Sequence, residues 1–486
     1  MARSLSQGRT ERRPDGFAAA WRALAPLTLI SVLLASTAVS GPRASDWNLR
    51  SAATEAAAPT SAVVATDPAA SSVPFVSAVH LAQTGDLTRL VFDLSGPVDV
   101  SAFVLGDPRR IIVDLPELSF RIDPESGRPA AGPKPAKGRN ARAPVVKPLA
   151  GVIASYRFGL FAPGKSRIVV DLAETARIVR AEVETTPGAG SRLVLDLAKA
   201  DAATFAKAAA AGEKVAASQS GEPRPGKTAA GDASLPIVVL DPGHGGIDAG
   251  AHGASDTQEK VLVFDFARSL AAHLEAQGRY RVLMTRTEDI FVPLSERVQI
   301  ARNAGAALLI SIHADTLSDA AGVSGATVYT VSDRASDAEA ARLADKENKA
   351  DLVAGLDSKE DASDVSDILF DLTRRETRAY SHVFARTLIG YFKESARLNK
   401  NPQRSAGFRV LKAPDVPSVL LELGYLSSER DLAQLRSPEW RETASKSVAK
   451  SIDAFFAARA PATPPRAAED KPDGKDVLSA VAPAIH

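Results

Sequence analysis

The sequence contains no cysteine. Disulfide bonds and thiolate zinc sites are therefore excluded, and any bound metal must use histidine, aspartate or glutamate side chains. An excess of one charge is also missing, because 59 Lys and Arg residues nearly balance 58 Asp and Glu residues. This balance argues against a protein that binds nucleic acid over much of its surface. At 486 residues, the chain is long enough for two or more domains.

Long hydrophobic runs are scarce, and the one near the N-terminus is too short to span a membrane comfortably. Residues 24–35 form an apolar stretch behind several arginines, and Ala38-Val39-Ser40 resembles a cleavage site. This pattern predicts an export signal peptide over residues 1–40, with a retained N-terminal anchor as the alternative. The Arg12-Arg13 pair fits a twin-arginine signal poorly, which leaves the export route open. We expect an exported protein with no membrane span in its mature form.

A six-residue pattern occurs four times between residues 73 and 200. The copies are RLVFDL at 89–94, RIIVDL at 110–115, RIVVDL at 167–172 and RLVLDL at 192–197. Each copy is a short β-rich run with alternating faces, and the repetition predicts a small all-β sandwich. The composition before it, at 41–72, predicts a flexible tether, and the composition after it, at 201–235, predicts a linker.

From residue 236 to residue 459 the pattern changes to strands that alternate with helices. Strands are predicted at 237–240, 280–285, 307–315, 408–412 and 418–427, and helices at 260–276, 294–304 and 438–458. This alternation predicts an α/β domain with a mainly parallel sheet flanked by helices. A charged, mostly helical insertion interrupts it at 333–374, and residues 460–486 are expected to be a disordered tail.

Two histidines lie at the ends of predicted strands. In IVVLDPGHGG the β-branched run stops at a Pro-Gly turn and presents His244 at a strand end, or alternatively in a simple solvent-facing turn. His313 ends the apolar strand LLISIHAD, and strand ends of a parallel sheet meet at one edge. Glu259 begins the helix between them. Two imidazoles and one carboxylate form a zinc set of the catalytic type, although Glu259 alone also suits charge compensation at a helix start.

A further carboxylate lies inside the apolar strand PSVLLELGYLS. An unpaired charge is costly there, so Glu422 either pairs with a structural arginine or has a chemical role. Beside an activated water it would act as a general base and then as a general acid. We favour the catalytic role because four acid or imidazole groups converge at predicted strand ends.

Together, DPGHGG, the Glu259 segment, SIHAD and LLELGYLS resemble the zinc-dependent N-acetylmuramoyl-L-alanine amidases of bacterial cell walls. The repeated β-region resembles, more loosely, the peptidoglycan-targeting AMIN domain of that family. The resemblance implies that His244, Glu259 and His313 bind Zn²⁺ and that Glu422 is the catalytic acid and base. His252 is the main competing ligand. Asp315 departs from the common SIHAN motif, and its role stays open.

The insertion has a counterpart in division-associated members, where a helix covers the zinc until an activator with a LytM-type domain releases it. Glu347 in ADKENKAD is our candidate for the occluding carboxylate, with Glu339 as a possible substitute. The resemblance thus implies a periplasmic enzyme that cleaves peptidoglycan during wall remodelling and daughter-cell separation, under autoinhibition. A catalytically silent peptidoglycan-binding regulator and a zinc peptidase or esterase are the alternatives.

Overall fold

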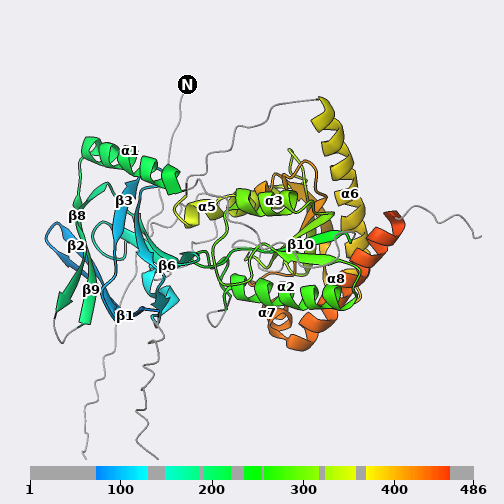
Figure 1. The fold of residues 1–486 in the computed structure, drawn as a ribbon, viewed down its shortest axis with the longest axis horizontal. Coiled ribbons are helices and arrows are strands. Elements are labelled where there is room, and N and C mark those ends of the chain that lie inside the picture. Colours follow the sequence, from blue (N-terminus) through cyan, green and yellow to red (C-terminus); the bar gives the residue numbers. More distant parts are fainter. Residues whose placement is uncertain are drawn as a thin grey trace, which may run out of the picture. The chain divides into compact units, whose positions relative to one another are not determined.

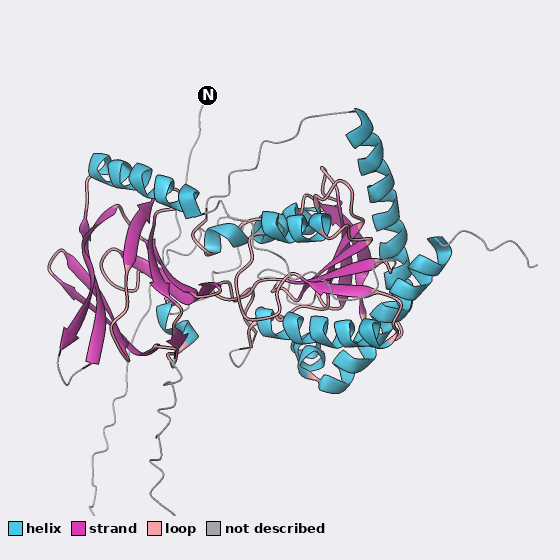
Figure 2. Cartoon of the chain, in the orientation of Figure 1, coloured by secondary structure: helices cyan, strands magenta, loops and turns pink. Residues whose placement is uncertain are grey.

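Two β-sheets form the N-terminal part of the folded chain, and a mixed sheet flanked by helices forms the C-terminal part (Figure 1, Figure 2). The computed structural model describes residues 73–129, 148–186, 190–219, 235–253, 257–316, 323–356 and 368–459. These residues belong to one compact unit. The predicted signal peptide, tether and C-terminal tail lie outside the described residues. Within the described ranges, no helix is both long and apolar enough to cross a bilayer.

The repeated β-region is a sandwich, as predicted. The first sheet has the order β5 (Ser119–Phe120), β1 (Phe75–Thr84), β2 (Leu87–Leu94), β9 (Gly190–Lys199) and β8 (Ala176–Thr186). The second has the order β3 (Ser101–Leu105), β4 (Arg110–Pro116), β7 (Lys165–Leu172) and β6 (Ile153–Ala162), and η1 (Pro124–Gly127) is a short 3₁₀ helix. Alternate side chains of both sheets meet in one apolar core. Burial of these side chains stabilises the sandwich.

The four repeat copies form the central strand pairs, β2 with β9 and β4 with β7. In the first pair Arg89 lies opposite Asp196, and their side chains are 2.7 Å apart. In the second pair Arg167 lies opposite Asp114, at 2.6 Å. The arginine that begins one copy therefore meets the aspartate of its antiparallel partner, which explains why both residues recur in the pattern.

The prediction of a linker at 201–235 is wrong for the first half of that range. Residues Ala202–Gln219 form an α-helix, α1, which packs against β3. Its apolar face is buried through Phe205, Ala209 and Ala216. The alanine-rich composition that suggested a linker also gives high helix propensity, and contact with the sandwich stabilises the helix.

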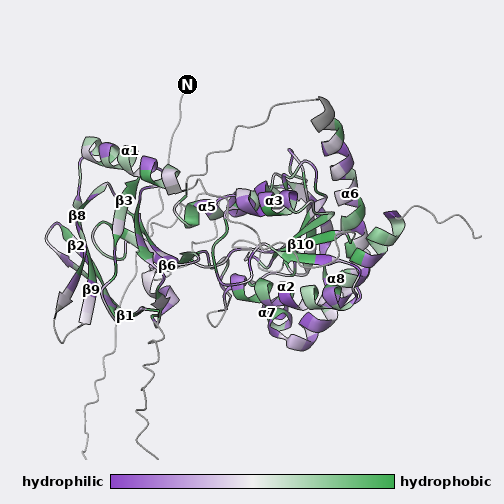
Figure 3. Cartoon of the chain, in the orientation of Figure 1, coloured by the Kyte–Doolittle hydropathy of each residue, from purple (hydrophilic) through white to green (hydrophobic). Residues whose placement is uncertain are grey.

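The C-terminal sheet is parallel except at one junction. Its order is β11 (Arg281–Met284), β10 (Ile237–Pro242), β12 (Leu308–His313), β15 (Ser418–Glu422), β13 (Ala326–Val331) and β14 (Leu398–Ala406). Strands β13 and β15 are antiparallel, and the other neighbours are parallel. Hydrophobic residues run along β10 (Figure 3), and the middle strands are buried on both faces. This burial is typical of an α/β sheet covered by helices.

Helices cover both faces of this sheet. One face carries α2 (Glu259–Ala276), α6 (Ile368–Phe392), α7 (Glu429–Arg436) and α8 (Pro438–Arg459). The other carries α3 (Leu294–Asn303) and α4 (Ala338–Glu347), followed by α5 (Ala350–Val353). The apolar stripe of α2, formed by Leu262, Phe266, Leu270 and Leu274, is buried in the main core. Figure 1 shows α2 and α3 on opposite sides of the sheet.

Four elements of this domain differ from the sequence predictions. Phe408-Arg409-Val410-Leu411-Lys412 was expected to be a strand, but Arg409–Leu411 is a 3₁₀ turn, η2. Its side chains Phe408, Val410 and Leu411 all enter one apolar cluster, which an alternating strand does not permit. Strands β13 and β14 and helix α7 were not predicted, and β13 supplies the antiparallel junction.

Candidate active site

The carboxyl ends of three neighbouring parallel strands carry the predicted site. Strand β10 ends two residues before His244, and β12 ends at His313. Strand β15 ends at Glu422, which lies opposite His313 in the ladder. The fold thus brings side chains that are far apart in sequence to one edge of the sheet, where ligands bind in open α/β sheets.

His244 is held in an unusual backbone conformation, with φ of 60°. Its Nδ1 lies 2.9 Å from Oδ2 of Asp248. With the shared proton on Nδ1, the ring presents Nε2 as a lone-pair donor, as in metal-binding histidines. This Nε2 is buried, has no hydrogen-bond partner among the described residues and lies 3.1 Å from Oε1 of Glu259. A cation would satisfy the nitrogen.

Glu259 is fixed in the site by the backbone. Its Oε2 accepts a hydrogen bond of 2.8 Å from Ala251 N–H, and its Oε1 accepts one of 2.9 Å from Ala314 N–H. The same Oε1 lies 3.2 Å from Nδ1 of His313. The side chain is 0% exposed. Glu259 therefore points into the cluster and does not face solvent at the start of α2.

Two glycines make room for this cluster. A Cβ on Gly243 would lie 2.4 Å from Cε1 of His313. A Cβ on Gly250 would lie 2.7 Å from both Glu259 Oε2 and His244 Cδ2, and its φ of 69° also favours glycine. These contacts explain two of the glycines around the DPGHGG motif as steric requirements of the site.

Glu347, at the end of α4, reaches the same two imidazoles. Its Oε2 lies 3.3 Å from His313 Nδ1 and 3.6 Å from His244 Nε2. The ligand atoms of His244, His313 and Glu347 all lie within 4.8 Å of one another. The space left among these side chains and Asn348 is a cavity of about 10 Å³. That volume holds about one water molecule and no substrate.

The electrostatics of the cluster favour a cation. Burial opposes protonation of His244, but the carboxylates of Glu259, Asp248 and Glu347 outweigh it and raise the pKa well above its usual value. Burial also opposes ionisation of Glu259, and the two imidazoles outweigh it and hold the pKa of Glu259 well below its usual value. The two shifts are reciprocal, because the positive imidazole and the negative carboxylate each stabilise the charged form of the other. Two imidazoles and a fixed carboxylate form a donor set that suits zinc.

Glu422 and Asp315 form the next layer of the site. Glu422 is 0% exposed, and its Oε2 accepts a hydrogen bond of 3.1 Å from Asp315 N–H. Burial, together with the charges of Asp315, Glu259 and Glu347, raises the pKa of Glu422 well above its usual value. Its Oε1 is buried and has no hydrogen-bond partner among the described residues. The alternative interpretation was that a structural arginine neutralises Glu422. Among the described residues no ion pair joins Glu422 to an arginine, and the buried Arg297 and Arg404 pair with Asp241 and Glu339.

Asp315, whose role the sequence left open, is covered by the insertion. Burial raises the pKa of its carboxyl to about 6, although Lys346 of α4 forms an ion pair with it and opposes the shift. Helix α4 therefore contributes two neighbouring residues to the site, Lys346 to Asp315 and Glu347 to the imidazoles.

Two other candidates lie elsewhere. His252, the competing ligand, has its Nδ1 3.0 Å from Oε1 of Glu125 in the β-sandwich. Glu339, the proposed substitute for Glu347, lies 2.8 Å from a guanidinium nitrogen of Arg404. The structure therefore gathers His244, Glu259, His313 and Glu347 and leaves these two side chains outside the cluster.

A buried polar network supports the turn that carries His244, and the sequence analysis missed it. Arg297 donates hydrogen bonds of 2.8 Å to Asp241 Oδ1 and to the backbone oxygen of His244. Asp241 also accepts from the hydroxyls of Thr285 and Ser311, each at 2.6 Å. Asp248 was missed as well, because a small acid in a glycine-rich turn looks like an ordinary turn residue.

Comparisons with known proteins follow the same division of the chain. The N-acetylmuramoyl-L-alanine amidase model matches residues 238–454, and the AMIN domain model matches residues 78–197. The amidase AmiC of Escherichia coli O6:H1 is 32% identical over 397 residues, which are 79% of this chain and 90% of that protein. AmiC of Neisseria meningitidis serogroup B is 29% identical over 395 residues, with coverage of 79% and 90%.

A solved structure, the N-acetylmuramoyl-L-alanine amidase AmiC2 of Nostoc punctiforme, is 25% identical. The match covers 47% of this chain and 99% of that chain, with a TM-score of 0.35.

Proposed function

Because the chain belongs to the N-acetylmuramoyl-L-alanine amidase family, we propose that it is a zinc-dependent peptidoglycan amidase whose insertion covers its own metal site. The reaction is hydrolysis of the amide between the N-acetylmuramoyl group and L-alanine. The observation that carries the proposal is the position of Glu347, within 3.6 Å of both imidazole nitrogens beside a cavity of only about 10 Å³.

His244, His313 and Glu259 are assigned as the resident ligands. Glu259 accepts backbone hydrogen bonds at both oxygens, so the surrounding domain holds it in place. Glu347 instead belongs to the insertion, and its Oε1 is buried with no hydrogen-bond partner in the described part of the chain. Glu347 is therefore the carboxylate that can withdraw, and its withdrawal opens the position that a catalytic zinc site keeps for water or substrate.

Zinc, when bound, polarises the amide carbonyl and lowers the pKa of a water molecule to about 7. Glu422 accepts a proton from the attacking water and delivers it to the leaving amine as the C–N bond breaks and the new C–O bond forms. The raised pKa of Glu422 suits a group that must hold and release a proton. The hydrogen bond from Asp315 N–H holds the carboxylate of Glu422 in position.

The cellular setting is proposed from the sequence. The arginine-rich, apolar N-terminus supports export to the periplasm, and the β-sandwich is assigned to peptidoglycan targeting. An enzyme whose site is covered needs a partner to uncover it. We assign that role to an activator with a LytM-type domain, and we place the activity in wall remodelling and daughter-cell separation.

The test compares the full chain with Glu347→Ala and, as a matched control, Glu339→Ala on the same helix. Glu347→Ala is expected to raise the basal release of peptides that start with L-alanine, because the open position returns, and Glu339→Ala is not. Mass spectrometry of muropeptide products measures the release and separates an amidase from a peptidase or esterase. Equal rates for Glu347→Ala and the parent would remove Glu347 from the mechanism. Lack of zinc, with no activity after deletion of residues 333–374, would support the silent regulator.

A further inference from the structure

The outer face of the second sandwich sheet is buried, although its strands carry the same repeat as the first sheet. In β2 exposed and partly exposed residues alternate with buried ones, whereas six of the seven residues of β4 are buried. Ile111 and Val113 of β4 enter the inner core, and Ile112 between them enters a separate cluster on the outside. Something in the chain therefore covers this face.

The end of the insertion covers part of this face, beside Ala216 of α1 and Ile247 and Phe291 of the catalytic domain. Three arginines of the sheet donate to three consecutive backbone carbonyls at the end of α5. The pairs are Arg110 Nη1 to Leu352 O, Arg157 Nε to Val353 O at 2.7 Å and Arg167 Nη1 to Ala354 O at 3.0 Å. The last carbonyls of a helix lack partners within it, and charged donors form the stronger class of hydrogen bond.

Steric fit and apolar packing support the same contact. A Cβ on Gly355 would lie 2.3 Å from Cδ1 of Ile112 and 3.5 Å from Cγ2 of Val169, so a side chain at this position would force Ile112 to move. Gly355 also has φ of 76°. Ala354 is fully buried in the outer cluster together with Ile112 and Val169.

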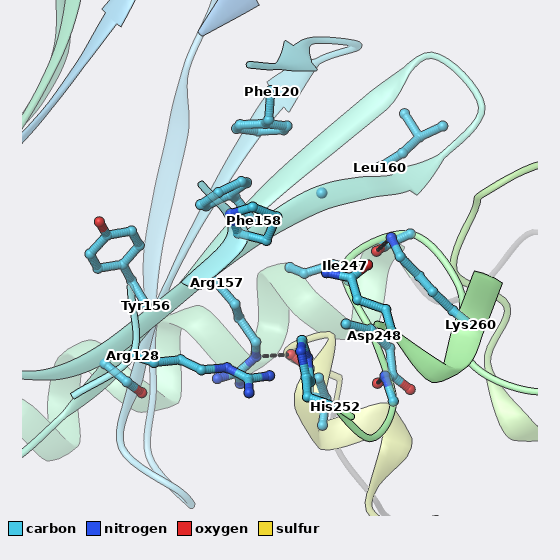
Figure 4. A pocket seen from close by; sticks show the side chains of 18 of the residues that line it. Phe120, Arg128, Tyr156, Arg157, Phe158, Leu160, Ile247, Asp248, His252 and Lys260 are labelled. Carbon is cyan, nitrogen blue, oxygen red and sulfur yellow. Dashed lines mark hydrogen bonds between the residues drawn. The ribbon is translucent and has the colours of Figure 1, made fainter. Parts of the chain in front are cut away.

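Of the three arginines, Arg157 lines a cavity of about 710 Å³. Figure 4 shows Arg157 extending from the sandwich side of this cavity, with Ile247 and His252 on the other side. The cavity also borders Leu352 and Val353. The contact between sheet and insertion therefore borders this cavity at Arg157 and is buried at Arg110 and Arg167.

This contact lies close in sequence to Glu347. Leu352 follows Glu347 by five positions. Between them, Asn348 Nδ2 donates to Gly407 O at 2.9 Å, and Asn348 Oδ1 accepts from Arg409 N–H at 2.8 Å. The short segment after Glu347 is thus tied to the catalytic domain at one end and to the sandwich at the other.

We propose that the β3-β4-β7-β6 face is a docking surface for residues 350–356 and that this docking keeps Glu347 over the imidazoles. The β-sandwich then acts on the active site as well as on wall material. This inference rests on the proposed occlusion by Glu347, and it adds Arg110, Arg157 and Arg167 as positioning residues.

The first measurement is hydrogen–deuterium exchange of the full chain. Arg110→Gln combined with Arg167→Gln removes two of the docking arginines. Arg89→Gln combined with Arg192→Gln changes the same repeat positions in the other sheet and is the matched control. We expect exchange of peptides from residues 338–356 to quicken about tenfold or more in the first variant. Each charged hydrogen bond that is lost should raise the population of the undocked state by about tenfold or more. Unchanged exchange in that segment, or an equal rise in the control, would overturn the docking.

Gly355→Ala perturbs the contact from the insertion side and leaves the sandwich sequence intact. It guards against a loss of folding in the arginine variants, and it should quicken exchange in the same segment. Unchanged exchange in this variant would also count against the docking.

The second measurement is basal hydrolysis, with and without Glu347→Ala. Docking variants should release more product than the parent but add nothing when Glu347 is already alanine, because both changes act through one step. An additive increase would contradict the coupling. If Glu347→Ala alone has the parent rate, the occlusion proposal fails, and the exchange result still decides whether the segment docks.

Discussion

Asp248→Asn tests the assignment of His244 as a ligand through the residue that orients it. Asp248 Oδ2 lies 2.9 Å from His244 Nδ1, and Oδ1 accepts a hydrogen bond of 3.1 Å from Gly250 N–H. An asparagine that keeps the Gly250 contact places its NH₂ group against Nδ1. The amide then donates to Nδ1, and the ring proton moves to Nε2, where it blocks the lone pair that faces Glu259.

Loss of such an orienting partner typically lowers metal affinity by about 10–100-fold, which is about 1.4–2.8 kcal/mol. We expect Asp248→Asn to fall in this range, measured by competition with a zinc chelator. Asp289→Asn is the matched control, because Asp289 accepts a hydrogen bond from Gly246 N–H in the same loop but contacts neither imidazole. Zinc affinity equal to that of the parent, or an equal loss in the control, would refute the role of Asp248.

Two further predictions concern the proton carrier and the sandwich. Glu422→Gln should lower hydrolysis by about 10²–10⁴-fold with zinc still bound, and normal muropeptide cleavage by this variant after removal of the insertion would contradict the mechanism. Burial opposes ionisation of Asp114, but Arg167 outweighs burial and lowers the pKa of Asp114. The ion pair therefore stabilises the folded state fully above the unfolded pKa of about 4, and this contribution is lost as pH falls through the lower folded pKa. Asp114→Ala should therefore cost about 3–5 kcal/mol of unfolding free energy at pH 7 and less in acid. The control is Asp93→Ala, because Asp93 pairs with the exposed Arg192 of the other sheet at 3.0 Å, and its loss should cost about 0–1 kcal/mol. Urea unfolding at both pH values measures the difference, and equal losses in the two variants would contradict the prediction.

The sequence predicted the parts of the fold in which local pattern and burial agree. Strands β10, β12 and β15 are apolar runs that end in polar motifs, and α2 shows a clear helical stripe. Strand β14 is polar and contains Pro402, which suits an edge strand but leaves no hydrophobic pattern to detect. The turn η2 looks like a strand because its residues are β-rich, and its contacts with α4 and β13 decide otherwise.

The candidate site also has residues that the sequence pattern indicates and contacts that it does not. The sequence singled out His244, Glu259, His313 and Glu422, which the structure places at one edge of the sheet, because charged or imidazole groups at the ends of apolar strands stand out. The contacts between the sandwich arginines and the insertion were not found, because backbone carbonyls have no signature in the sequence. Arg110 and Arg167 share a repeat with Arg89 and Arg192, and the pattern alone does not show which sheet is covered.

Anomalous diffraction at the zinc absorption edge, on crystals of the full chain grown with zinc, tests the central claim most directly. The account predicts one peak bounded by Nε2 of His244, Nδ1 of His313 and a carboxylate oxygen of Glu259, with Glu347 on its remaining side. A peak centred on other side chains, such as His252 and Glu125, or no peak among the three ligands would contradict it.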